Sequence, residues 1–563
     1  MKTVKSAVRT WLASVSVLVL VSLLVPVCAM AQAQPLSTVP GVPNVVNPNE
    51  NDFQRQTHFL TFIGSYIPES AASARAYYAA IDPNNTKPTF PQWLVNAGFI
   101  SNVSQWHPSG PQIIACDLPG CDLPSHTNGV LTYGPNVINT DSHAIVLNAA
   151  DLGFVRNQFI RCKPSCTAAN PIIYTYLENY PVAPFASQAS GGDSGFPTNS
   201  GYPSQADAAK AINSAITRPL GQIDGVSPCV DATKCIERIA DVAFEWAPPA
   251  TNPTSSTRYG QQYAYIFFHD ANGITESTNF PDSLVNNARI LDFKAANGTY
   301  LFVQQGDKFA PNLDAVGFKQ HPGVCLICHG GTPQNLTSTG AYPRQGNIDG
   351  FRFLPLDIRN LLFTSDSGSE RTSRLNQEPS IKRYNRVVLI TARGGAGVDD
   401  QGVFRPPHIA EVIRGWYAGY PGDTTMSSPT QNSNFIPKGW LEPVHGGTAP
   451  AGSEDVYLHV VGPSCRTCHF NRELSLDFGT AASFRQESDL QQLSLIAACK
   501  QNNPDPNAKF MPLALLTFVR AWQTQNGAQV LPSADNFTVD HAVDKLAAYF
   551  GYGSVAGYCA TNP

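Results

Sequence analysis

Hydrophobic and polar residues alternate in short runs over roughly the first half of the chain. Residues 70–81 (SAASARAYYAAI) end at an Asp-Pro pair, which predicts a short helix. Residues 264–268 (AYIFF) predict a strand, and residues 289–293 and 300–304 flank Asn297-Gly298, a turn typical of a β-hairpin. We therefore predict a mixed, mostly β domain over residues 32–310, and this stretch contains no cofactor-attachment motif.

The pattern changes after about residue 311, where helical stretches and polar loops follow one another. The last helical stretch, residues 539–550, repeats apolar residues on one face, as an amphipathic helix does. A Pro-, Ser- and Thr-rich stretch at residues 420–437 predicts a linker, so we place two further domains at residues 311–425 and 426–563. The predicted fold class is α+β: an N-terminal mostly-β domain followed by two mainly α-helical domains.

The N-terminus has the pattern of a secretory signal peptide. Three basic residues precede an apolar run over residues 11–27, and Ala29-Met30-Ala31 supplies a small-x-small cleavage site. We therefore expect residues 1–31 to be removed and the mature chain to be periplasmic or secreted, with no further membrane span. An uncleaved anchor is the alternative, although this apolar run is short for a spanning helix.

Export into an oxidising compartment changes what the 13 cysteines predict. Cys28 leaves with the signal peptide, four cysteines belong to the two motifs described next, and eight remain. An even number in this compartment favours disulfides, with free thiols as the alternative. From proximity along the chain we expect the pairs Cys116/Cys121, Cys162/Cys166 and Cys229/Cys235, and the two cysteines that remain, Cys499 and Cys559, would form the fourth disulfide.

Two CxxCH motifs carry the most specific chemical signal. Their residues are Cys325, Cys328 and His329 in the first motif, and Cys465, Cys468 and His469 in the second. Two thiols three positions apart can add to both vinyl groups of a haem, and the adjacent His then ligates the iron. A redox disulfide or half of a zinc site is the alternative, but zinc needs further Cys and His pairs at regular spacing. We therefore expect two covalently bound c-type haems, with both histidines as iron ligands.

The second motif and the residues after it resemble bacterial class I cytochrome c domains. About forty residues after His469 the chain reads Lys509-Phe510-Met511-Pro512-Leu513, and the helix at residues 539–550 follows. In that family a Met, commonly followed by Pro, supplies the sixth iron ligand. The resemblance therefore implies that Met511 ligates the second iron, and a thioether–imidazole pair raises the potential as suits an electron-transfer centre. The alternatives are a core role for Met511 and His541 as the ligand.

The first motif is not followed by such a methionine. Residues 352–356 (RFLPL) parallel residues 509–513 (KFMPL) in the order of residue types. If these segments are a diverged repeat, Leu354 stands where a Met would bind iron, and the first iron is five-coordinate, weakly bound by water or ligated from elsewhere. The candidate replacement ligands are His321, His408, His445 and Met426, and the candidate acid–base groups over an open haem are Glu378 and Glu411.

Two main function classes follow from the motifs. An electron-transfer cytochrome would pass single electrons between periplasmic donor and acceptor proteins. The alternative is a haem-dependent enzyme, because the order of the two units is distantly similar to the dihaem cytochrome c peroxidase group, which implies peroxide or O2 at the first haem. A third class, a ligand-binding protein with accessory haems, stays open. The net charge of -5 and 14% charged residues provide no basic field and exclude nucleic acid as a partner.

Overall fold

The structure is a computed structural model of the whole chain. It describes residues 71–106, 113–116, 137–148, 154–180, 212, 215–216, 240–248, 260–269, 276–277, 290–294, 300–304, 321–331, 334–348, 350–365, 370–392, 408–420, 425–470, 478–486 and 542–553. The expected signal peptide, Met511, His541 and the expected cysteine pairs other than Cys162/Cys166 lie wholly or partly outside the described residues.

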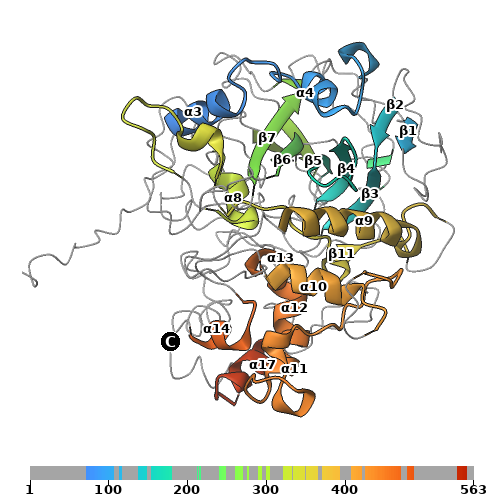
Figure 1. The fold of residues 1–563 in the computed structure, drawn as a ribbon, viewed down its shortest axis with the longest axis vertical. Coiled ribbons are helices and arrows are strands. Elements are labelled where there is room, and N and C mark those ends of the chain that lie inside the picture. Colours follow the sequence, from blue (N-terminus) through green and yellow to red (C-terminus); the bar gives the residue numbers. More distant parts are fainter. Residues whose placement is uncertain are drawn as a thin grey trace, which may run out of the picture.

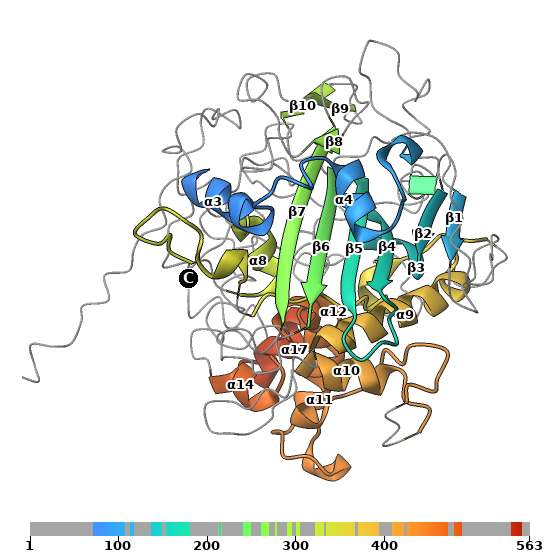
Figure 2. The same cartoon turned by 45° about the horizontal axis from the view of Figure 1, so that its top comes forward.

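Six antiparallel strands from the N-terminal half form the central sheet, in the order β3-β4-β5-β6-β7-β8 (Figures 1 and 2). Their bounds are Ser142–Asn148 (β3), Val155–Lys163 (β4), Ile172–Tyr180 (β5), Ala240–Ala247 (β6), Gln261–His269 (β7) and Glu276–Ser277 (β8). A seventh strand, β11 (Leu361–Leu362), comes from beyond the first CxxCH motif and pairs antiparallel with β3. The C-terminal half of the chain therefore contributes one edge of the N-terminal sheet.

Two further pairs of strands form small sheets that are separate from the central sheet. Strand β1 (Ile113–Cys116) runs parallel to β2 (Val137–Thr140). Strands β9 (Ile290–Lys294) and β10 (Tyr300–Gln304) are antiparallel and confirm the hairpin that the sequence predicts there. Strand β7 likewise confirms the strand predicted over residues 264–268.

One face of the sheet is covered by α4 (Phe90–Ala97), with α3 (Ala71–Ile81) next to it (Figure 2). Helix α4 begins where the Thr89 hydroxyl accepts a hydrogen bond from the Gln92 amide, and it ends at Gly98, whose φ of 83° is left-handed. The Phe90 ring packs edge-on against Tyr176 of β5, with ring centroids 5.1 Å apart. Helix α3 confirms the helix predicted over residues 70–81.

The opposite face of the sheet is covered by α8 (Gly323–His329) and α9 (Arg374–Ala392). Helix α9 is joined to β3 by side chains: Gln377 Oε1 accepts from the Ile145 amide at 2.8 Å, and Ser142 Oγ donates to the Ser380 carbonyl at 3.2 Å. Helix α8 carries the first CxxCH motif, so this motif faces the sheet.

A helical region follows the sheet in the sequence and lies beneath it in Figure 1. Its helices are α10 (His408–Trp416), α11 (Ser453–Val456), α12 (Gly462–Ser464), α13 (Arg466–His469), α14 (Ala481–Gln486) and α17 (Ala542–Tyr549), with a π-helical turn at Tyr457–Val461 (η7). Short 3-10 turns occur at Val103–Gln105 (η2), Pro343–Gly346 (η3), Ile358–Asn360 (η4), Lys438–Trp440 (η5) and Pro443–His445 (η6). The α+β class with a sheet before a helical region is confirmed, and α17 lies within the predicted C-terminal helix.

One hydrophobic core joins the sheet, α8, α9 and the helical region, and it includes Tyr176, Leu326, Val388, Val461 and Tyr549. The stretch predicted as a linker takes part in this packing. Buried Gln431 accepts from the Ile358 amide at 2.7 Å and donates to the Leu356 carbonyl at 3.3 Å. The division at residue 425 stays a prediction. Within the described residues, no helix combines the length and the apolar character needed to cross a bilayer.

Candidate functional site

Helix α8 brings the three residues of the first motif to one side. Cys325 and Cys328 are three positions apart, and His329 is four positions after Cys325, so their side chains share a helix face. The helix ends at Gly330. The backbone then turns away from the helix axis through positive φ values of 76° at Gly330 and 90° at Gly331, which glycine adopts without steric cost. All three side chains line the same cavity.

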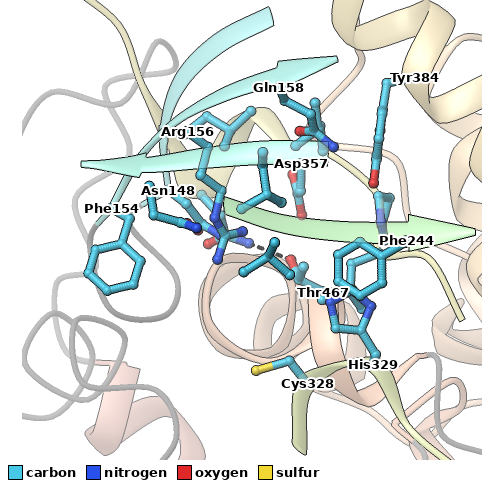
Figure 3. A pocket seen from close by; sticks show the side chains of 18 of the residues that line it. Asn148, Phe154, Arg156, Gln158, Phe244, Cys328, His329, Asp357, Tyr384 and Thr467 are labelled. Atoms are coloured by element: carbon cyan, nitrogen blue, oxygen red, sulfur yellow. Dashed lines mark hydrogen bonds between the residues drawn. The ribbon is translucent and has the colours of Figure 1, made fainter. Parts of the chain in front are cut away.

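His329 is held in a defined orientation. Its Nδ1 lies 2.7 Å from the carbonyl oxygen of Arg352, which can only accept, so Nδ1 carries the proton and Nε2 presents its lone pair. The Phe244 ring lies against the imidazole with ring centroids 4.7 Å apart (Figure 3). The centroid of the Phe351 ring lies 5.4 Å from that of the imidazole. Burial lowers the pKa of His329 to about 4, which favours the neutral form that binds metal.

The cavity beside this motif measures about 950 Å³, including its open mouth. Five parts of the chain form its wall: the sheet, α8, the segment 354–361, α9 and the second motif (Figure 3). The lining residues that the argument uses are Arg156, Gln158, Phe244, Leu354, Asp357, Asn360, Tyr384 and Thr467. Two cysteines and an oriented imidazole that face one cavity fit a covalently attached haem.

The central sheet supplies one wall of this cavity. Because side chains alternate across a strand, Arg156 and Gln158 of β4 face the cavity while Asn157 faces the other side. Phe244 of β6 faces the cavity as well. The predicted N-terminal domain contains no attachment motif, yet its strands form part of the first site, which the sequence analysis missed. The available signal was the run of three polar residues, Arg156, Asn157 and Gln158, within β4.

Tyr384 of α9 adds a hydroxyl group to the polar part of the wall. The Gln158 side chain hydrogen-bonds to this hydroxyl, while Oε1 of Gln158 is buried without a hydrogen-bond partner. Burial raises the pKa of Tyr384 to about 12, and the hydrogen bond from Gln158 and the charge of Arg156 oppose this shift. Tyr384 is therefore a neutral hydrogen-bond donor near neutral pH.

The second motif lies on α13 and is anchored by its two middle residues. Arg466 donates from Nε and Nη2 to the two carboxylate oxygens of Asp357, at 2.6 and 2.9 Å. Its guanidinium also donates to the Tyr457 hydroxyl at 3.1 Å and lies 4.9 Å from the centre of the Trp416 ring. Tyr457 and Trp416 thus pack against the buried charge of Arg466.

Thr467 connects the second motif to the first cavity. Its side chain lines the same cavity as Cys325, Cys328 and His329. Its hydroxyl accepts a 2.8 Å hydrogen bond from Nδ2 of Asn360, which also lines the cavity (Figure 3). The two motifs, which are 140 residues apart in sequence, therefore meet at one cavity.

His469 of the second motif packs face to face on Phe478, with ring centroids 4.0 Å apart and an interplanar angle of 2°. His408 lies close to this group. It packs tightly on Gly479, where an added Cβ would come within 1.9 Å of the His408 ring, and its ring centroid is 6.4 Å from that of Phe470. His408 was a candidate ligand for the first iron, but the structure places it beside the second motif.

The other candidate ligands of the first iron also lie elsewhere. His321 is buried against Tyr77 and Tyr78, with ring centroids 5.1 and 4.9 Å away. His445 is exposed and contacts Glu454, and Met426 is buried in the core. None of the three lines the described cavity.

The candidate acid–base groups have structural partners instead. Glu378 pairs with Arg374 at 3.3 Å and accepts from the Gln431 amide. Glu411 accepts a 2.7 Å hydrogen bond from the Lys438 amide. Neither carboxylate is part of the described cavity wall, so the structure does not favour them as distal groups.

Leu354 lines the same cavity as His329. It follows Arg352 by two residues, and the Arg352 carbonyl oxygen accepts the hydrogen bond from Nδ1 of His329. The parallel between residues 352–356 and 509–513, and the place that it gives Leu354 at the first iron, stays a prediction.

The cysteines of the two motifs are not disulfide-bonded, whereas Cys162 and Cys166 form a disulfide, as their proximity predicts. Among the described residues, the one group of three potential metal ligands is Asp141, Cys162 and Cys166, and its cysteines are disulfide-bonded. The described geometry therefore favours neither a redox disulfide nor a zinc site at the CxxCH motifs.

Comparison of the chain with protein-family models, with curated proteins and with solved structures gave no match. The functional assignment therefore rests on the motifs and on the geometry around them.

Proposed function

We propose that the protein is an exported dihaem c-type cytochrome that transfers single electrons between periplasmic redox partners. The observation that carries this proposal is the position of Thr467, a residue of the second motif that lines the cavity of the first. Attachment at Cys468, the residue after Thr467, would put the second haem next to that cavity wall. Two centres this close can exchange electrons within the molecule.

The residues of the first site have separate roles in this proposal. Cys325 and Cys328 hold the haem, and Nε2 of His329 binds its iron, which supplies a centre that can be oxidised and reduced. The Arg352 carbonyl fixes the tautomer and the ring orientation of His329 through the 2.7 Å hydrogen bond. Phe244 and Phe351 pack on the imidazole and exclude water from it.

In the second site, Cys465 and Cys468 are the attachment points and His469 is the proximal ligand. The resemblance to class I cytochrome c domains assigns the sixth position to Met511. Arg466 and Asp357 hold the two sites in one relative position through their buried ion pair. This arrangement supports two cytochrome c-like haem sites that share a boundary, with residues 311–425 and 426–563 as the units.

A second candidate function is an enzyme of the dihaem peroxidase or oxidase type, with the first haem as the reaction site. It is favoured by the composition of the first cavity. Among the described lining residues, His329 is the one His, Met or Lys, so no second strong iron ligand is seen in that wall. Arg156, Gln158 and Tyr384 could then contact peroxide or O2.

The test is a visible absorption spectrum of the purified protein in the oxidised, reduced and CO-treated reduced forms. Two low-spin haems with no CO shift support electron transfer as the function and imply that a residue outside the described cavity completes the first site. One high-spin haem that binds one equivalent of CO supports the enzyme. Protein without covalently bound haem would contradict both.

A further inference from the structure

The Cys162–Cys166 disulfide closes a short loop at the end of β4. Cys162 lies within β4, opposite Ile173 of β5, and is 1% exposed. Cys166 lies in the loop between these two strands and is half-buried. Cys166 is therefore the more accessible of the two residues, and access determines which sulfur of a disulfide an incoming thiolate can attack.

A buried carboxylate lies against this bond. Asp141 is 5% exposed, and its Oδ2 accepts a 2.7 Å hydrogen bond from the Cys162 amide and lies 3.7 Å from Sγ of Cys166. Its Oδ1 pairs with Arg161 at 3.3 Å, which holds the carboxylate in place. A disulfide sulfur carries no proton, so the contact between Oδ2 and Sγ is not a hydrogen bond in the oxidised protein. Reduction converts it into one, because a thiol S–H can donate to a carboxylate.

Contacts other than the disulfide also hold this loop. Lys163 and Ile172 pair where β4 and β5 meet the loop. Within the loop, the Ala168 amide donates to the Ser165 carbonyl at 3.1 Å, and the hydroxyl groups of Ser165 and Thr167 are 3.1 Å apart. The two cysteines are four positions apart, and a disulfide constrains the unfolded chain least when the loop that it closes is short. The bond can therefore open while the strands stay paired.

We propose that Cys162 and Cys166 form a reversible redox pair that exchanges with small thiols. Cys166 is the sulfur that the thiol attacks, and Asp141 is a positioning residue whose carboxylate stabilises the reduced form. This activity belongs to the β-rich half of the chain. It is separate from both CxxCH motifs and does not depend on the proposed function.

Two thiol molecules complete the reaction. The thiolate of the first attacks Sγ of Cys166 and forms a mixed disulfide, while the bond to Cys162 breaks and its electron pair stays on Sγ of Cys162, which takes up a proton. The thiolate of the second attacks the external sulfur of the mixed disulfide and releases the Cys166 thiolate, which also takes up a proton. The protein gains two electrons and two protons, and the two thiols lose them and leave as one disulfide. The new S–H group of Cys166 then donates to Oδ2 of Asp141.

The experiment uses the full-length protein as purified, without denaturant and under nitrogen, in buffers with different ratios of reduced to oxidised glutathione. Each sample is quenched with acid and alkylated, and the redox state of Cys162 and Cys166 is read from the masses of their peptides. We expect the pair to become reduced as the ratio rises, to re-form as it falls, and to leave the circular dichroism spectrum unchanged. The proposal is overturned if the pair stays oxidised at every ratio, or if the protein unfolds as the pair is reduced. A denatured sample checks the reagents and the detection.

The variant Asp141→Asn tests the positioning role. It keeps an oxygen atom for the Cys162 amide but removes the charge, so the reduced form loses a charge-assisted hydrogen bond. We expect the equilibrium constant for reduction by glutathione to fall about tenfold, which corresponds to about 30 mV. The matched control Asp455→Asn removes an exposed carboxylate of α11 and should give the wild-type value. A wild-type equilibrium constant for Asp141→Asn overturns the role of Asp141.

Two single variants test which sulfur is attacked. Cys162→Ser leaves the thiol of Cys166, and Cys166→Ser leaves the buried thiol of Cys162. In the folded proteins iodoacetamide should alkylate Cys166 at least about tenfold faster than Cys162, because the reaction needs access to the sulfur. Equal rates, or a faster reaction at Cys162, overturn the assignment of Cys166. If Asp141→Asn does not fold, the glutathione titration of the wild type and these two rates decide the proposal.

Discussion

Asp357 and Arg466 form an ion pair in which neither side chain is exposed to solvent. Asp357 lines the first cavity, and Arg466 lies between the two cysteines of the second motif. Removing one partner of such a pair leaves a buried charge without compensation, which costs more than the pair itself contributes. The pair therefore fixes the second motif against the segment that follows the first.

Replacing Asp357 by Asn should lower the free energy of unfolding by about 3–5 kcal/mol, because Arg466 stays buried without its counter-charge. Chemical denaturation followed by circular dichroism measures this loss. The matched control is Asp455→Asn, which removes a pair with Lys545 whose side chains are 49% and 31% exposed. There we expect a loss of about 0–1 kcal/mol, and equal losses in the two variants would contradict the role of burial.

The double variant Cys325→Ser/Cys328→Ser should lose the first haem and keep the second, because each motif provides its own thioether bonds. Covalent haem per polypeptide should fall to about half, measured by haem staining after denaturing electrophoresis and by the spectrum of the denatured protein. The control Cys162→Ser/Cys166→Ser removes a disulfide outside both motifs and should retain both haems. Full haem content in the first variant would show that this motif does not attach haem.

Met511→Ala should lower the potential of the second haem and leave the first unchanged, because the thioether stabilises ferrous iron. His408→Ala tests a further side chain, because His408 was a candidate ligand of the first iron but lies beside the second motif. His408 packs on Gly479, and the neighbouring Phe478 stacks on His469, the expected proximal ligand. His408 therefore lies close to the second motif, and its role as an iron ligand there can be tested. If His408→Ala alone shifts the second haem's spectrum and potential, His408 and not Met511 is the ligand.

The pH dependence of stability should carry a contribution from His143. Burial, followed by the charge of Arg371, lowers the pKa of His143 to about 3. Between about pH 3 and pH 6.5 the unfolded chain therefore binds a proton that the folded chain does not. The free energy of unfolding falls as pH decreases through this window, by up to about 1.4 kcal/mol per pH unit.

The variant His143→Gln isolates that contribution, because every other titrating group is shared with the wild type. Denaturation at several pH values should give a shallower dependence for the variant across this window. Parallel curves for the two proteins would show that His143 titrates alike in both states.

Elements that depend on local sequence were predictable. The helix α3, the strand β7 and the pairing of β9 with β10 follow from residue pattern and turn composition within about twenty residues. The two CxxCH motifs were also visible, because haem attachment requires a fixed spacing of Cys and His, and attachment at them stays a prediction. These predictions needed no knowledge of which distant segments meet.

The cavity wall depends on contacts between distant segments and was not predictable. Arg156, Asp357, Tyr384 and Thr467 come from four regions of the chain. The composition of residues 420–437 indicated a solvated linker, yet Gln431 is buried, because polar side chains can also satisfy buried backbone groups. The five-residue parallel around Leu354 was too short to establish its place at the iron.

Strand β11 has a consequence for the N-terminal half considered by itself. Leu361 and Leu362 pair with Leu147 and Asn148, at the margin of the sheet. A truncated chain that stops near residue 310 would leave this part of β3 with open amide and carbonyl groups, and such margins recruit other chains. The β-rich half would then self-associate, so its solubility depends on a segment encoded more than fifty residues beyond its predicted end.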